Sequence, residues 1–178
     1  MAILKIARMG HPVLLAKAEP VADALAPSIQ GLLADMLETL EDSGGVGLAA
    51  PQVFVSLRLF IYYVPSERAE NGAGVPLRAV LNPEIIPIGT EQVLDWEGCL
   101  SIPGLRAAVP RYARILLRGQ DEDGNDFSEE LSGFEARIVQ HEADHLDGTL
   151  YPMRVSDFRY FGFNEELARF PQTLPEIL

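Results

Sequence analysis

The sequence is poor in cysteine, in positive charge and in long apolar runs. One cysteine in 178 residues cannot form a disulfide within the chain, which agrees with a reducing compartment. Lysine and arginine number 14 against 26 aspartates and glutamates, a net charge of −12. This balance argues against a nucleic-acid binder held by phosphate contacts and against binding to an anionic membrane surface. No apolar run is long enough to span a bilayer.

The first residues also lack the features of a secretory signal. The start of the chain, 1–8, has neither a long apolar region nor a cleavage site, so we expect the bacterial cytoplasm or, after processing, an organellar matrix or stroma. The length suits one domain over residues 1–178. A hydrophobic content of 48% is typical of a globular chain rather than a disordered one.

Histidine is scarce too, but two of the three histidines stand four residues apart. His141 and His145 would lie on one face of a helix, so their imidazoles can converge on one divalent metal ion. Glu142 follows the first of them, where a carboxylate can act on a water molecule. The alternative is a helix with two ordinary histidines. We interpret the third histidine, His11, as a loop residue.

Signals at both ends predict a helix around this motif. Ser132 and Glu135 have the spacing of a capping box, and Gly148 stands where a left-handed residue commonly ends a helix. The motif does not contain a third ligand. Cys99 is a candidate, because a Cys/His/His set binds a metal and leaves a fourth position open for water. Alone, a single cysteine is more often a small buried apolar residue.

A run of small residues, 45–52, follows the first predicted helix. Two glycines around Val46, followed by two alanines, suggest a backbone that is closely approached by something else. The alternative is a tight connection between a helix and a strand. Gln52 ends the run and could donate an amide N–H to a site.

Hydrophobic periodicity predicts the remaining elements. The apolar spacing after Pro27 predicts a helix that stops at Gly44 and Gly45. We predict strands or extended segments at 2–7, 57–64, 77–82 (ended by Pro83), 91–96 and 111–119, a short strand after the turn at 121–125, and an amphipathic segment capped at 156–157. The fold class that follows is α+β, with short, mostly antiparallel strands around one central helix that carries the metal ligands.

Three segments together resemble the signature motifs of the peptide deformylases. They are Gly-Val-Gly-Leu-Ala-Ala-Pro-Gln at 45–52, Glu-Gly-Cys-Leu-Ser at 97–101 and Gln-His-Glu-Ala-Asp-His at 140–145. The similarity extends from residue 10 to about residue 148. The stretches 103–107 and 137–139 look closer to the mitochondrial and plant-like branch than to the commonest bacterial one.

The resemblance implies a hydrolase that removes the formyl group from N-formylmethionine at the start of new polypeptides and releases formate. It implies that Cys99, His141 and His145 bind the metal and that Glu142 is catalytic, which agrees with the spacing argument. Family resemblance points to Fe²⁺, although the ligands alone would accept Zn²⁺, Ni²⁺ or Co²⁺. As a mechanism, we expect Glu142 to take the proton of the attacking water.

The same hypothesis assigns residues to the oxyanion and to the ligands. We expect the backbone N–H of Leu100 and the side-chain amide of Gln52 to hold the developing oxyanion. We expect Glu97 to bond Arg111 or a ligand imidazole and so support the metal site, with a plain surface carboxylate as the alternative.

Substrate-binding residues follow from the resemblance and from helical spacing. The segment 45–47, with Val46 and Gly47, looks like the strand against which the peptide backbone lies. Phe134 and Ile138 lie on the helix face of His141 and, with Val46, are candidate walls of the methionine pocket; each could equally be a core residue. Arg106 matches an arginine that the family uses near the substrate backbone.

Arg137 is a departure, because many relatives carry an apolar residue four positions before His141. The family's activity implies nascent chains as partners and a transient contact with the ribosome, and the acidic balance argues against a strong basic contact. No sequence-specific nucleic-acid binding and no membrane partner are expected.

Two other classes share part of this pattern. A zincin-type endopeptidase also has His-Glu-x-x-His, but it takes its third ligand from a glutamate or histidine downstream of the helix. This chain has no histidine there, and its Glu165 and Glu166 stand in a different context. A non-catalytic protein would have a closed structural metal site, or would be an inactive relative. A closed site usually needs four protein ligands, and an inactive relative is expected to lose Glu142 or Gln52.

Overall fold

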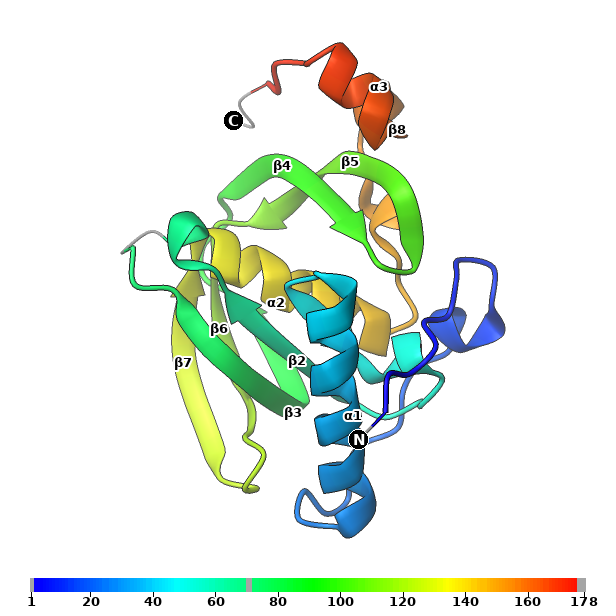
Figure 1. The fold of residues 1–178 in the computed structure, drawn as a ribbon. Coiled ribbons are helices and arrows are strands. Elements are labelled where there is room, and N and C mark those ends of the chain that lie inside the picture. The colour runs from blue at the N-terminus through cyan, green and yellow to red at the C-terminus, as the bar shows by residue number, and fades with distance from the viewer. Residues whose placement is uncertain (1, 70–71, 176–178) are drawn as a thin grey trace.

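In the fold, helix α2 (Gly133–Leu146) lies between two antiparallel sheets (Figure 1). It is seen in a computed structural model that describes residues 2–69 and 72–175. The larger sheet has the order β1 (Gly47–Ala49), β2 (Leu59–Val64), β3 (Val75–Pro87), β6 (Arg114–Gln120) and β7 (Asp126–Ser132). The smaller sheet has the order β4 (Gln92–Cys99), β5 (Ile102–Tyr112) and β8 (Phe161–Phe163). All pairings between these strands are antiparallel, so the predicted α+β fold is confirmed.

Alternation along β2 explains how the larger sheet holds two helices. Phe60 and Tyr62 point to the core that contains α2, whereas Leu59 and Ile61 point to the core that contains α1 (Pro27–Ser43). Successive side chains of a strand face opposite sides of the sheet, so a strand buried on both faces reads as a continuous apolar run. A third core joins β5 to the N-terminal segment and to the turn η4 (Tyr151–Arg154).

Both predicted helices are present, and their ends differ in how well they were predicted. α1 begins at Pro27 and ends before Gly44, which has φ +68°, as predicted. The predicted capping box of α2 is wrong. Ser132 occupies the N-cap, but its side chain makes no capping hydrogen bond, and Glu135 instead accepts a hydrogen bond of 2.9 Å from the Tyr62 hydroxyl. Gly148 has the predicted left-handed conformation, φ +69°.

One strand prediction needs correction, and one strand was missed. Residues 2–7, which were expected to be extended, belong to no strand of either sheet. The strand at 77–82 does not end at Pro83 but continues to residue 87, because a register shift between Leu81 and Glu84 carries the chain past the proline. β5 was not predicted, and it contains Pro103 and Pro110. Both prolines lie outside 105–107, the part of β5 that pairs with β8, so their missing N–H groups can face an open edge.

The predicted C-terminal amphipathic segment is divided into shorter elements. Asp157 accepts a hydrogen bond from the backbone N–H of Arg159 and caps the turn η5 (Phe158–Tyr160). β8 follows and pairs with β5 at the edge of the smaller sheet. The short helix α3 (Asn164–Arg169) comes next and packs against β5 and β8 (Figure 1). The remaining turns are η1 (Pro12–Leu15), η2 (Ala50–Val53) and η3 (Ser66–Arg68). Within the described residues, no helix is both long and apolar enough to cross a membrane.

Candidate metal centre and substrate cleft

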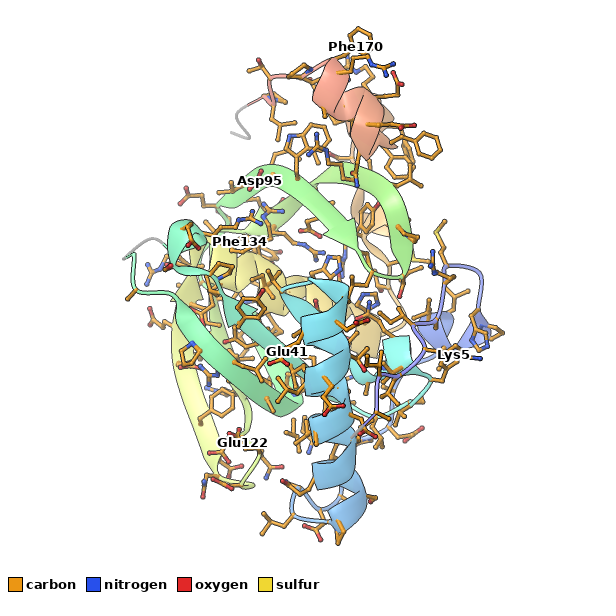
Figure 2. The ribbon with its side chains drawn as sticks, viewed as in Figure 1. Lys5, Glu41, Asp95, Glu122, Phe134 and Phe170 are labelled. Carbon is orange, nitrogen blue, oxygen red and sulfur yellow. The ribbon has the colours of Figure 1, made fainter. Side chains whose placement is uncertain are left out.

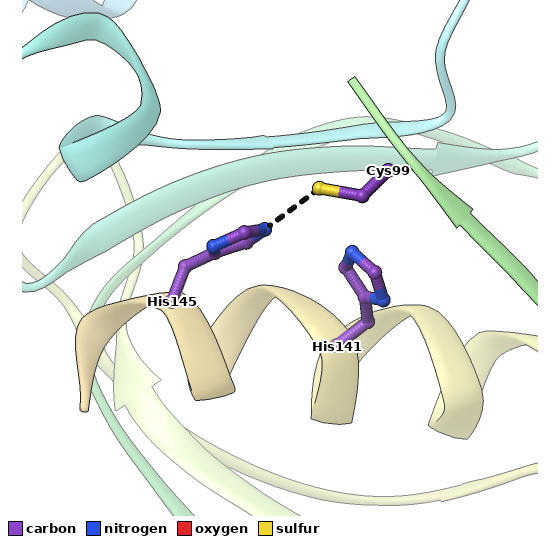
Figure 3. Close-up of side chains that lie close together, drawn as sticks. All are labelled: Cys99, His141 and His145. Atoms are coloured by element: carbon purple, nitrogen blue, oxygen red, sulfur yellow. Dashed lines mark hydrogen bonds between the residues drawn. The ribbon is translucent and has the colours of Figure 1, made fainter. Parts of the chain in front are cut away.

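The structure brings Cys99, His141 and His145 together (Figure 3). One ligand atom from each lies within 4.8 Å of the other two, and Cys99 Sγ is 3.3 Å from His145 Nε2. Cys99 ends β4, whereas both histidines project from α2 one turn apart. The thiol and the imidazoles are far apart in the sequence, and the packing of the smaller sheet on α2 brings them together.

The surroundings of the two imidazoles act on their protonation in opposite directions. Glu97 Oε2 lies 2.8 Å from His141 Nδ1, which leaves Nε2 of that ring for the cluster. Burial disfavours a charged His141, but hydrogen bonds with Cys99 and Glu97 raise its pKa well above the ordinary value, so a metal ion that binds His141 must displace a proton from the ring. Burial lowers the pKa of His145 well below the ordinary value and keeps that ring neutral. A thiol sulfur and two imidazoles fit a divalent metal with an open fourth position.

Glu142 lies beside this cluster with its carboxyl group buried. Burial raises its pKa to about 7, and its Oε2 atom has no hydrogen-bond partner among the described residues. The side chain packs on the backbone of Gly47, where a Cβ atom would lie 2.8 Å from Glu142 Cδ. The close approach suspected from the run of small residues is therefore present, and the approaching group is Glu142.

Gln52 is held against the cluster by both ends of its amide. Its Oε1 accepts a hydrogen bond of 2.8 Å from the Ala49 N–H, which orients Nε2 toward Ser101 Oγ at 3.2 Å and Cys99 Sγ at 3.5 Å. Leu100 lies in the turn directly after Cys99 and lines the same cavity. The residues expected to hold an oxyanion thus lie beside the thiol.

Behind the cluster, buried charges form one network. Arg111 donates to both oxygens of Glu97, at 2.8 and 3.0 Å, and its Nη1 lies 2.6 Å from Asp144 Oδ2. Arg154 holds the other oxygen of Asp144 at 2.7 Å. Burial alone would raise the pKa of Glu97, but the hydrogen bonds from Arg111 and His141 outweigh it and hold that pKa well below the ordinary range. The contacts expected for Glu97 with Arg111 and with an imidazole are both present.

Arg137 belongs to the same network. Its Nη1 donates to Glu97 Oε1 and to the carbonyl of Val109, both at 2.8 Å, and its Nη2 donates to the carbonyl of Val93 at 2.6 Å. The charged head is therefore turned toward the smaller sheet and neutralised there. The departure from an apolar residue at this position places a guanidinium behind the cleft, and the charge is paired with Glu97.

A cavity of about 320 Å³ opens beside the cluster. Val46, Gly47, Phe134 and Ile138 line it, as expected for substrate-binding residues, together with a set that sequence reasoning did not assign: Arg68, Trp96 and Asn164. Figure 2 shows Phe134 at the start of α2, below Asp95 of β4. The cleft is thus bounded by β1, the β4–β5 turn and α2.

Arg106 does not line this cavity. Its guanidinium carbon lies 5.2 Å from the centroid of the Trp96 ring, and Trp96 does line it. Arg106 therefore contacts a residue of the cleft wall, Trp96, without lining the cleft itself. The roles of Asp144 and Arg154 were also missed; Asp144 lies inside the histidine motif and offered a signal, whereas nothing in the sequence marks Arg154.

Comparisons with known proteins agree with this geometry. The model of the family described as polypeptide deformylase matches residues 3–160. Peptide deformylase 1 of Nitrosomonas europaea is 44% identical over 98% of this chain and 99% of its own. Peptide deformylase 2 of Pseudomonas putida is 47% identical over 93% of this chain and 94% of its own.

Solved structures show the same fold. The class I type b peptide deformylase of Acinetobacter baumannii, bound to Met-Ala-Ser, superposes with a TM-score of 0.78 at 37% identity, over 86% of this chain and 98% of its own. The relatives are bacterial, so the suggested closeness to the mitochondrial and plant-like branch is not borne out. The chain belongs to the peptide deformylase family, metalloenzymes that hydrolyse the N-formyl group from newly made polypeptides.

Proposed function

We propose that Cys99, His141 and His145 hold one divalent ion and that Glu142 moves the proton during deformylation. The observation that supports this is the convergence of three ligand atoms within 4.8 Å, beside a buried carboxyl group, on the wall of a cavity. An ion bound there would lower the pKa of a water molecule and polarise the formyl carbonyl.

Glu142 acts first as a base and then as an acid. Its carboxylate accepts a proton from the water as the water oxygen bonds to the formyl carbon, and it returns a proton to the nitrogen as the carbon–nitrogen bond breaks. Formate and a free amino terminus are the products. A carboxyl pKa of about 7 suits both directions of transfer near neutral pH.

Gln52 and Leu100 stabilise the oxyanion that forms during the attack. Gln52 Nε2 is already directed toward Cys99 Sγ, and the backbone of Leu100 follows the same thiol. Two N–H donors fixed in advance of the reaction reduce the cost of developing negative charge.

The peptide binds by adding a strand to β1. In the described sheet β1 is an edge strand that pairs only with β2, and the carbonyl of Val46 accepts a hydrogen bond from Tyr63. Because backbone groups alternate between the two edges of a strand, the N–H and C=O of Gly47 face the open edge. The methionine side chain then lies against Val46, Phe134 and Ile138, and Arg106, held on Trp96, contacts the peptide backbone farther out.

Fe²⁺ is the ion that we propose in the cell, because the family resemblance points to it. Zn²⁺, Ni²⁺ and Co²⁺ suit the same donors, and zinc binds such sites more tightly than ferrous iron. Elemental analysis of protein purified without oxygen, compared with its rate of formate release, tests this. Full activity with zinc alone would contradict a need for iron.

We place this activity in the bacterial cytoplasm, with residues 1–178 acting as one catalytic domain. The bacterial relatives support the compartment. A net charge of −12 favours only a transient contact with the ribosome. Co-sedimentation with ribosomes that survives 0.5 M salt would contradict this.

The test of the mechanism is formate release from a formyl-Met-Ala-Ser peptide. We expect the metal-loaded parent to release formate, Cys99→Ala to lose both bound metal and activity, and Glu142→Ala to keep metal while its rate falls by about 10²–10⁴-fold. Metal content is measured on the same samples. Substantial activity of Glu142→Ala with metal bound would remove Glu142 from the mechanism, and no release by a fully metallated parent would overturn the proposed function.

A further inference from the structure

Arg68 is an exposed cation fixed at the mouth of the cleft. It ends η3, and its guanidinium carbon lies 3.4 Å from the centroid of the Phe134 ring. Phe134 is half-buried, and both side chains line the cavity that contains Glu142. A guanidinium stacked on an aromatic face is held in a narrow range of positions. An exposed side chain that would otherwise sample many rotamers is therefore positioned over the rim.

Among the residues that the structure describes, no carboxylate forms an ion pair with Arg68. Arg137 is paired with Glu97 at 2.8 Å, and Glu142 is buried at the inner end. Among the described residues that line the cavity, Arg68 is the charged side chain exposed to solvent. The whole chain carries −12, so the mouth of the cleft has a local charge opposite to the average of the molecule.

The position of Arg68 selects one residue of the peptide. This step rests on the proposed function, in which an extended peptide pairs with β1 and its methionine lies against Phe134 and Ile138. Side chains two residues apart in an extended chain point to the same side, about 7 Å from each other. The third residue of the peptide therefore points to the same wall as the methionine, and the exposed side chain of Arg68 stacks on Phe134 in that wall.

We propose that Arg68 is a specificity-determining residue that binds a carboxylate on the third residue of the formylated peptide. The chemistry is an ion pair between a planar guanidinium and a carboxylate. A free peptide C-terminus at the same place would supply the same group, so the test uses peptides with an amidated C-terminus.

The experiment compares kcat/KM for formate release from amidated formyl-Met-Ala-Asp, formyl-Met-Ala-Ser and formyl-Met-Ala-Lys. At low salt we expect the parent to prefer aspartate to lysine at the third position by about three- to fivefold, the range of a partly exposed ion pair. The preference should shrink in 0.5 M NaCl, because salt screens an exposed pair. The same substitutions at the second position should change kcat/KM less, since that side chain points to the opposite side.

Variants then assign the preference to one side chain. Arg68→Ala should remove the discrimination, Arg68→Lys should keep most of it, and Arg68→Glu should reverse it. Arg118→Ala is the matched control, because it removes the same charge from an exposed pair with Glu84 on β6 and β3. Arg118→Ala should prefer aspartate to lysine at the third position as strongly as the parent does.

The ratio of kcat/KM for the aspartate peptide to that for the lysine peptide tests this inference separately from the proposed function. If the parent releases formate from the serine peptide but Arg68→Ala shows the parental ratio of aspartate to lysine, Arg68 does not select the third residue. A preference confined to the second position would also overturn the assignment. If no peptide is deformylated by the metal-loaded parent, the proposed function fails and this inference fails with it.

Discussion

Gly47 is in contact with the side chain that we propose as the proton carrier. A Cβ atom at this position would lie 2.8 Å from Glu142 Cδ and 2.9 Å from Cγ. The obstructed atoms belong to a flexible side chain, so the protein can relieve the contact by moving the carboxyl group rather than the backbone. The absence of one methyl group thus fixes the place of the carboxyl group.

Gly47→Ala should therefore reduce activity much more than stability. A displacement of the carboxyl group by about 1 Å is enough to lower kcat/KM by about 100-fold. Formate release and the thermal unfolding midpoint, measured on the same preparation, check this. Gly31→Ala in α1 is the control: beyond the adjacent residues and the nearby backbone of α1, no described atom lies within 4 Å of its added Cβ, and alanine should stabilise the helix by about 0.5–1 kcal/mol with parental activity. Parental activity in Gly47→Ala would show that Glu142 tolerates the methyl group or is not needed.

Sequence reasoning identified the residues of rare type at restricted spacing, and it missed those whose role depends on which residues they contact in the folded chain. Cys99 and the two histidines were recognisable because metal ligands belong to few residue types at restricted spacings. Arg137 was recognised as a departure, but its partners Val93 and Val109 are backbone carbonyls, which leave no trace in the sequence. Arg68 was missed because an exposed arginine becomes informative only when the ring beneath it is known.

The elements were predictable where local signals decide them. Pro27 and the glycine at 44 bound α1 as expected, since these residues have conformations suited to helix ends. β5 escaped prediction because Pro103 and Pro110 usually argue against a strand, whereas here β8 pairs only with 105–107. The pairing of β5 with β8 joins residues that are far apart in the sequence, so no short stretch of the chain predicts it.

The end of α2 depends on contact with the N-terminal segment. Gly148 has φ +69°, and an added Cβ would meet the backbone of Leu15, with 2.6 Å to its carbonyl oxygen. Backbone atoms cannot move aside as a side chain does, so Gly148→Ala carries both the left-handed strain and a clash. Together these should lower the free energy of unfolding by about 3 kcal/mol.

Gly89→Ala separates the two contributions. Gly89 has φ +79°, but beyond its two chain neighbours no described residue has an atom within 4 Å of its added Cβ, so only the strain of about 1 kcal/mol remains. Urea unfolding of both variants measures the difference. Equal losses would mean that the packing of Leu15 on the end of α2 contributes nothing beyond backbone conformation.

For the whole molecule, the metal site joins parts that are far apart in the chain. Cys99 comes from the smaller sheet, and His141 and His145 come from the helix that supports the larger sheet. Sequence patterns predicted that these residues share a site, but not that β4 and β5 form a hairpin that delivers the thiol to α2. The buried ion pairs around Glu97 connect β4 and β5 to α2, and no local stretch of sequence contains both members of a pair.

Removal of the ion should therefore weaken the whole fold. An ion that binds only the folded state, at a free concentration about 100 times its dissociation constant, stabilises that state by about 2.7 kcal/mol. In a chain of this length, 1 kcal/mol shifts the unfolding midpoint by about 2–4 °C, so a chelator should lower it by about 5–10 °C. Scanning calorimetry of the metal-loaded protein, before and after chelation, measures this shift. Cys99→Ala, which lacks one ligand, should unfold at the same temperature with and without chelator. An equal shift in that variant would mean that the chelator acts elsewhere, and no shift in the parent would mean that the ion does not hold the two sheets together.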